Sequence, residues 1–196
     1  MIKIENLSYA YTENNIIDNM NFNFSEGKIY RIVGNNGIGK TTLLKLIYGN
    51  LIPSEGKILR QCSDNKIFYL SNQLPLDHNL TVVDHINFVR KTFNIDRNIF
   101  KQKEYLLTEL KINNFGNQYI ENISLGTQKK VLFFLAYLID YKVLLLDEFF
   151  SGIDKGGIEV ISKAIKLYVQ EGGTVIFVTH QDDESKYLEY TTFEMS

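Results

Sequence analysis

A glycine-rich segment of the chain has the residue types and spacing of a phosphate-binding loop, G-x-x-x-x-G-K-[ST]. It consists of Gly34, Asn35, Asn36, Gly37, Ile38, Gly39, Lys40 and Thr41. Glycines let a backbone curl so that successive N–H groups point at phosphate oxygens, and the start of a following helix adds a positive dipole end. Lys40 would supply a cation to the β- and γ-phosphates, and the Thr41 hydroxyl suits Mg²⁺. We assign Thr42 to the same nucleotide site. A ligand-free glycine turn before a helix is the alternative, which the Lys-Thr pair disfavours.

A second candidate is a pair of adjacent acids, Asp147 and Glu148, at the end of the apolar run 143–146. In an open α/β sheet, ligands gather where strands end. Asp147 suits Mg²⁺, held through the metal's water shell. Glu148 alternates to the other face, where it could orient and deprotonate an attacking water. A solvated strand end followed by a turn is the other interpretation of this pair.

His180 follows a third apolar run, 174–179. A lone histidine at a strand end is more often structural than catalytic. Because it lies downstream of the acid pair, we favour a catalytic role in which His180 hydrogen-bonds the γ-phosphate.

Hydrophobic periodicity indicates the elements that must position these residues. It predicts strands at 2–7, 29–33, 66–70, 143–146 and 174–179, and helices after Gly34, near 82–93, 99–111, 124–138 and 156–170. Strands alternating with helices predict an α/β fold with a mostly parallel sheet and an antiparallel β edge. The helical signal between 81 and 138, which opens on a Thr81/Asp84 capping box, predicts an inserted helical subdomain. We therefore expect one domain, 1–196, with an α/β core and N-terminal β subdomain (1–73 and 141–196) and a helical subdomain (74–140).

Composition limits the remaining functions. The chain is 44% hydrophobic and 22% charged with a net charge of −2, which gives no reason to expect nucleic acid as a partner. Cys62 is the single cysteine, so neither an internal disulfide nor a cysteine metal site is expected. No run approaches the roughly 20 apolar residues of a spanning helix, so a membrane role would need a partner.

The order of these motifs resembles that of the ABC ATPase family along nearly the whole chain. Tyr11 matches the aromatic residue that stacks on adenine, although Tyr9 stands close by and a plain surface tyrosine is the alternative. Gln73 matches the Q-loop glutamine, which contacts Mg²⁺ and senses the partner; a generic loop glutamine is the alternative.

The segment 123–128 looks like the family signature LSGGQ, with Leu125 in place of a glycine and Thr127 in place of the glutamine. Ser124 and Gly126, at a helix start, would hold the γ-phosphate of a nucleotide bound to a second subunit. Asp154 matches the D-loop, and Phe149 stands where many relatives have proline, a difference that should alter loop stiffness more than chemistry.

The resemblance implies a P-loop ABC ATPase that uses ATP and Mg²⁺ and forms a nucleotide-sandwich dimer with a second nucleotide-binding subunit. It also implies a separate membrane permease, with this chain cytoplasmic and peripheral on the inner face of the cell membrane. The short sequence segments 68–73, 80–84 and 179–181 are most similar to those of the ATPase subunit of the haem exporter of cytochrome c maturation. Peptide, lantibiotic, lipid and drug exporters are alternatives. So are a non-transport ABC ATPase acting on nucleic acid or the ribosome, and a soluble P-loop kinase.

Overall fold

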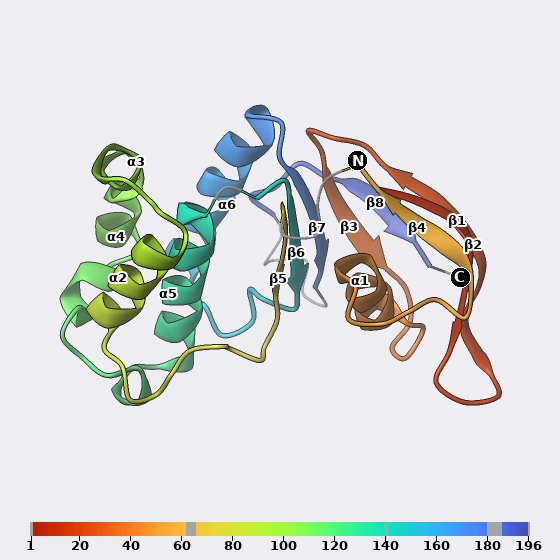
Figure 1. Ribbon diagram of the computed structural model, residues 1–196, viewed down its shortest axis with the longest axis horizontal. Helices are drawn as coiled ribbons and strands as arrows, with labels where there is room; N and C mark the ends of the chain where they lie inside the picture. The colour runs from red at the N-terminus through yellow and green to blue at the C-terminus, as the bar shows by residue number, and fades with distance from the viewer. Residues whose placement is uncertain (1, 62–65, 140, 180–185, 196) are drawn as a thin grey trace.

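The computed structural model describes residues 2–61, 66–139, 141–179 and 186–195. Figure 1 shows three parts in a row: antiparallel strands near the chain ends, a central parallel sheet with helices on both faces, and further helices at the far end. The predicted fold class is confirmed by this arrangement.

The antiparallel strands form a sheet of their own with the order β2-β1-β4. These strands are β1 (Ile2–Ala10), β2 (Asn15–Phe24) and β4 (Glu55–Arg60). Ile2 and Ile4 of β1 are buried while Lys3 between them is exposed, the alternation expected of a sheet with one covered face. The sequence pattern predicted a strand over the first part of β1 but did not predict β2 or β4.

The central sheet has five strands in the order β5-β6-β7-β3-β8, and every neighbouring pair is parallel. Its members are β3 (Ile29–Val33), β5 (Ile67–Leu70), β6 (Val143–Asp147), β7 (Thr174–Val178) and β8 (Thr191–Glu194). Because all five run the same way, the segments that follow them meet at one edge of the sheet. The glycine-rich loop after β3 and the acid pair at the end of β6 therefore share that edge.

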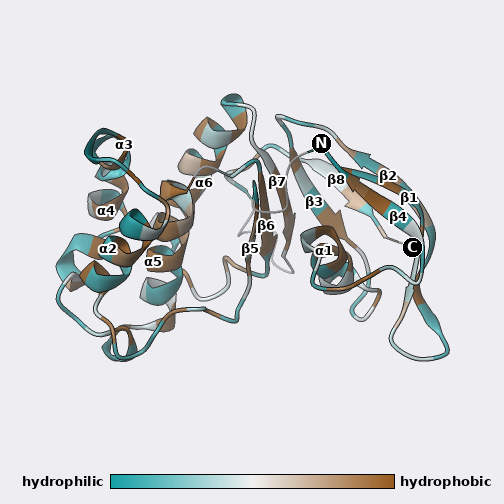
Figure 2. Cartoon of the chain, in the orientation of Figure 1, coloured by the Kyte–Doolittle hydropathy of each residue, from teal (hydrophilic) through white to brown (hydrophobic). Residues whose placement is uncertain are grey.

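Helices cover both faces of this sheet (Figure 1). Helix α1 (Lys40–Tyr48) packs on one face, whereas α5 (Leu125–Leu138) and α6 (Lys155–Gln170) pack on the other. Strand β6 alternates between the two cores, with Leu145 packed toward α1 and Leu144 toward α5 and α6. All five β6 residues are buried, as parallel strands with two covered faces require. Figure 2 shows the resulting hydrophobic band along β6 and β7 between the helical layers.

The chain between β5 and β6 is helical, as predicted. It contains α2 (Val82–Thr92), α3 (Arg97–Lys103), α4 (Tyr105–Glu109) and the 3₁₀ helices η2 (Ile112–Phe115) and η3 (Ile120–Asn122) before α5. The capping box forms, with the Thr81 side chain accepting from the Asp84 N–H. The single helix expected at 99–111 is two helices, divided at Glu104. The subdomain limits at 74 and 140 stay a prediction. No helix among the described residues is long and apolar enough to cross a membrane.

Candidate nucleotide-binding site

The glycine-rich loop encloses the Lys40 ammonium group. Lys40 is 8% exposed, and its Nζ donates to the carbonyl oxygens of Gly34 at 2.7 Å and Asn35 at 3.0 Å. The Ile38 N–H donates to the same Asn35 carbonyl at 3.3 Å, which closes the loop. The Ile38 side chain packs toward the α1 core. Ile38 can therefore offer a ligand its backbone but not its side chain.

Two features of the loop leave donors for an anion. Gly37 and Gly39 have φ values of 82° and 108°, which L side chains rarely adopt, and a Cβ at Gly39 would lie 2.7 Å from Ile16 Cγ2. Gly39 is also the N-cap of α1 and supplies no side-chain hydrogen bond. The first-turn N–H groups of a helix have no partner within the helix, so those of α1 are available to phosphate oxygens.

A hollow of about 370 Å³ adjoins the loop. It is lined by Tyr11, Ile16, Asn36, Gly37, Gly39, Lys40, Thr41, Thr42, Glu148 and Val178. Tyr11 is 54% exposed, and its hydroxyl lies 3.4 Å from Thr42 Oγ1. The structure thus brings Tyr11 to the loop, whereas its contact with adenine stays a prediction. Ile16 and Val178 were missed, since an apolar side chain carries no chemical signal in a sequence.

Asp147 accepts one hydroxyl group on each of its carboxylate oxygens. Thr41 Oγ1 donates to Oδ1 at 3.0 Å, and the Tyr69 hydroxyl donates to Oδ2 at 2.7 Å. Burial, and then the hydrogen bond to Asp147, raise the pKa of Tyr69 well above its usual value, so its hydroxyl remains a donor. Sequence reasoning paired Thr41 with Asp147 but missed Tyr69.

Glu148 and Gln73 line the same hollow beside this carboxylate. A second hollow of about 310 Å³ is lined by Thr41, Lys45, Asn50, Tyr69, Ser71, Asn72, Gln73, Asp147 and Glu148. Glu148 also lines the hollow beside the loop, so Glu148 and Thr41 belong to the lining of both hollows. Its φ is 51°, and its N–H donates to Val178 O at 3.0 Å. Gln73 is exposed, and its N–H donates to Ser71 Oγ at 3.1 Å.

Ser124 and Gly126 lie on the other side of the sheet. Ser124 is the N-cap of α5, and its Oγ accepts from the Thr127 N–H at 3.3 Å. Neither residue lines the two hollows just described, and α5 and α1 cover opposite faces of the sheet (Figure 1). The structure therefore does not bring these two predicted residues to the loop of the same chain. Leu125 between them is 55% exposed.

Two lysines at the start of α5 fasten it to neighbouring loops. Lys129 is 1% exposed, and its Nζ donates at 2.6 Å both to Asn72 Oδ1 and to Ser151 O. Lys130 forms an ion pair with Asp154, which lowers the pKa of that carboxyl. Asp154 Oδ1 also accepts from the Gly157 N–H at 2.8 Å and caps α6. In the sequence Lys129 belongs to the polar stretch 127–130 at the start of α5, so its burial gives no local signal.

The expectations for Phe149 and His180 both stay predictions. Phe149, which follows the acid pair, is fully buried, with its ring centroid 6.4 Å from that of Phe133. His180 lies outside the described residues, so its catalytic role stays a prediction.

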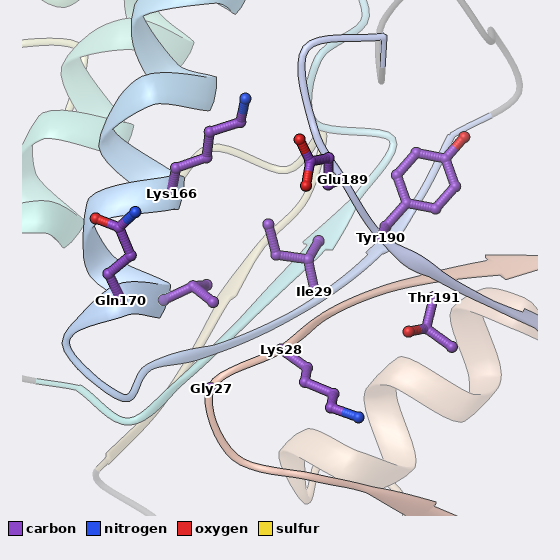
Figure 3. A pocket seen from close by; sticks show the side chains of 9 residues that line it. Gly27, Lys28, Ile29, Lys166, Gln170, Glu189, Tyr190 and Thr191 are labelled. Carbon is purple, nitrogen blue, oxygen red and sulfur yellow. The ribbon is translucent and has the colours of Figure 1, made fainter.

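A larger hollow of about 480 Å³ lies elsewhere (Figure 3). Its lining includes Lys28 and Ile29 at the start of β3, Lys166 of α6, and Glu189 just before β8. It sits where the parallel strands begin, at the sheet edge opposite the loop. None of the predicted site residues lines it.

The glycine-rich loop, the acid pair and the parallel sheet together have the arrangement of a P-loop nucleotide-binding protein. The family model for "ABC transporter" matches residues 17–151. An uncharacterized ABC transporter ATP-binding protein of Methanocaldococcus jannaschii is 33% identical over 188 residues, which are 95% of this chain and 71% of that protein.

Two further comparisons agree. A cytochrome c biogenesis ATP-binding export protein of Reclinomonas americana is 31% identical over 191 residues, 92% of this chain and 85% of that protein. A dimeric ATP-binding cassette solved with ADP and Pi has the same fold, with a TM-score of 0.83 at 22% identity over 100% of this chain and 94% of that one. The chain therefore belongs to the ABC transporter family. The predictions of an ABC ATP-binding subunit and of ATP hydrolysis are confirmed.

The packing of Gly126 gives a testable prediction. A Cβ at Gly126 would lie 2.4 Å from the Gly152 carbonyl oxygen, whereas one at Gly156, the second residue of α6, would meet only Asp154 Oδ1 at 3.4 Å. We expect Gly126→Ala to lower the free energy of unfolding by about 1–3 kcal/mol through overpacking. The matched control Gly156→Ala should raise it by up to about 1 kcal/mol, since alanine favours a helix. Urea denaturation measures both, and equal effects of the two changes would contradict this reading of the contact.

Proposed function

We propose that this chain binds MgATP beside the glycine-rich loop and hydrolyses it, as one of two ATP-binding subunits that drive a separate membrane permease. One observation carries the proposal. Lys40, Thr41, Asp147 and Glu148 converge on adjoining hollows, although the sequence separates the first two from the last two by more than a hundred residues. A cation, a hydroxyl, a buried carboxylate and a second carboxylate are the groups that phosphoryl transfer to water requires.

The hollow beside the loop fits a nucleotide. The Tyr11 ring offers a surface for the adenine base, and Ile16 adds an apolar wall. The backbone of 34–39, together with the Lys40, Thr41 and Thr42 residues that open α1, surrounds the phosphate position. The positive end of α1 and the Lys40 ammonium both favour an anion there.

The oxygen atoms beside Asp147 fit Mg²⁺. Thr41 Oγ1 and Asp147 Oδ1 lie 3.0 Å apart, and Gln73 lines the same hollow. Hydroxyl, carboxylate and amide oxygens are the donors that this hard cation prefers. When bound, Mg²⁺ neutralises charge on the phosphate oxygens. Thr41, Asp147 and Gln73 would hold it there.

Glu148 is the proposed general base. Glu148 directly follows β6 with a left-handed backbone conformation, and it lines both hollows. Its carboxylate there would orient a water molecule and accept its proton, while Lys40 stabilises charge on the phosphates. His180 is proposed as a further γ-phosphate contact.

A second ATP-binding subunit would complete the site. Ser124 and Gly126 stand at the start of α5, a place suited to phosphate, but on the opposite face of the sheet from the loop. A partner subunit could present this helix start to the nucleotide held by the first. Asp154 would contribute by holding the loop before α6 through Lys130 and the Gly157 N–H.

Transport through a permease, with the chain on the inner face of the cell membrane, is supported by the family to which the chain belongs. Export is the proposed direction, since one relative at 31% identity is named an export protein. The resemblance of residues 68–73 to the haem exporter subunit makes haem one candidate cargo, beside peptides, lantibiotics, lipids and drugs.

Removal of the proposed base gives the first test. Glu148→Gln should retain ATP binding but lower Mg²⁺-dependent ATP hydrolysis by about a hundredfold or more, since general bases contribute that much. Lys40→Ala should instead weaken ATP binding itself. Steady-state phosphate release and binding of a fluorescent ATP analogue separate the two effects. Hydrolysis by Glu148→Gln at the wild-type rate would rule out this assignment of the base.

A second experiment examines the partner subunit. The Glu148→Gln variant should dimerise when ATP is added, and Ser124→Ala in that background should weaken dimerisation by about tenfold, the effect of one lost hydrogen bond to a charged group. ATP binding by the monomer should not change, because Ser124 is remote from the loop of its own chain. Light scattering after size exclusion reports the mass. Dimers of unchanged stability would contradict the role given to Ser124.

Coupling to a permease is the third property to test. The purified chain should hydrolyse ATP slowly, and reconstitution with its permease in lipid vesicles should increase the rate per ATP-binding subunit at equal nucleotide. Equal rates with and without the permease, or tight salt-sensitive binding of DNA or ribosomes by the isolated chain, would favour a non-transport function instead.

A further inference from the structure

Tyr69 reaches the proposed metal site from the strand next to Asp147. Strand β5 pairs in parallel with β6, and Tyr69 is opposite Leu145, two residues before Asp147. Tyr69 and Leu145 belong to the same apolar cluster on the α1 face of the sheet. Because side chains two residues apart share a face, the long Tyr69 side chain spans this offset and its hydroxyl meets the carboxylate.

The two hydroxyl bonds fix the rotation of the Asp147 carboxylate. Asp147 is 6% exposed, so few other groups compete for its oxygens. Oδ1 accepts a hydrogen bond from Thr41 Oγ1 at 3.0 Å, and Oδ2 accepts one from the Tyr69 hydroxyl at 2.7 Å. Among the described residues, the Tyr69 hydroxyl is the one hydrogen-bond donor that holds Oδ2 in place.

We propose that Tyr69 is a positioning residue for Mg²⁺: its hydroxyl holds Oδ2 of Asp147 so that Oδ1, beside Thr41, is the oxygen presented to the metal. This inference rests on the proposed function, which makes Thr41 and Asp147 the metal-holding pair. In this proposal Tyr69 is not a ligand of the metal and acts on it through the Asp147 carboxylate.

The position of the Tyr69 ring links the metal site to Gln73. The Tyr48 ring of α1 packs against it with centroids 5.6 Å apart. Strand β5 ends one residue after Tyr69 and leads into the segment 71–73, which lines the same hollow as Tyr69 and Asp147. Tyr69 therefore fixes the end of β5 and the Asp147 carboxylate relative to each other.

The substitution Tyr69→Phe removes the hydroxyl and keeps the ring. We expect it to raise the Mg²⁺ concentration needed for tight ATP binding by about tenfold, the effect of losing a hydrogen bond to a charged acceptor. ATP binding in excess EDTA should be unchanged. The Glu148→Gln background prevents turnover, so binding is measured at equilibrium with a fluorescent ATP analogue. With Mn²⁺ as the probe, electron paramagnetic resonance measures bound metal directly.

Two further variants make the result decisive. Tyr48→Phe makes the same chemical change in the adjacent ring, and it should keep the wild-type Mg²⁺ requirement. Asp147→Asn should remove most of the effect of Mg²⁺ on ATP binding, and adding Tyr69→Phe to it should change nothing more. Thermal unfolding of each variant checks that it is folded.

The outcomes separate this inference from the function beneath it. If Asp147→Asn keeps the wild-type Mg²⁺ requirement, the proposed metal site is wrong. If Asp147→Asn loses it while Tyr69→Phe behaves as wild type, only the role of Tyr69 is overturned. Equal weakening of ATP binding by Tyr69→Phe with and without metal would also overturn it, because the hydroxyl would then serve packing alone.

Discussion

The parallel pairing of β5, β6, β7 and β3 is the constraint on which the site depends. Each strand ends at the same sheet edge, so residues far apart in sequence arrive together: the loop that holds Lys40, the carboxylates of Asp147 and Glu148, and the segment leading to Gln73. The bond between Thr41 and Asp147 joins residues 106 positions apart. A slip of one residue in the β5–β6 register would turn Tyr69 to the other face of the sheet and break its bond to Asp147.

The two faces of the central sheet carry different groups of candidate site residues. The α1 face carries the proposed nucleotide-binding residues, whereas Ser124 and Asp154 cap α5 and α6 on the other face. Buried Lys129 connects these sides because its ammonium bonds both Asn72, next to Gln73, and Ser151, three residues after Glu148. A buried charge bonded to two loops resists separation of any one of them, since an unpaired ammonium in the interior is costly. We therefore expect α5 to move together with the loops that contain Asn72 and Ser151.

Much of the site was predictable because its chemistry is local in sequence. The eight residues of the glycine-rich loop, the acid pair and the Thr81 cap each carry their signal within a few positions. Strand β2 was missed because four of its ten residues are asparagine, which is depleted in strands; pairing with β1 overrides that preference. Tyr69 and Ile16 were missed for a different reason: their partners are set by strand register and by packing, which no local pattern records.

Glu148 has a left-handed backbone conformation. Its φ of 51° is a conformation in which a residue with a Cβ is less stable than glycine by about 1 kcal/mol. The hydrogen bond from its N–H to Val178 O, together with the buried strand before it, holds the torsion against this preference. Part of the folding free energy is thus stored as torsional strain at the residue whose side chain is the proposed base. A glycine at this position would release the strain and lose the carboxylate, so at this one peptide unit thermal stability and catalytic competence pull in opposite directions.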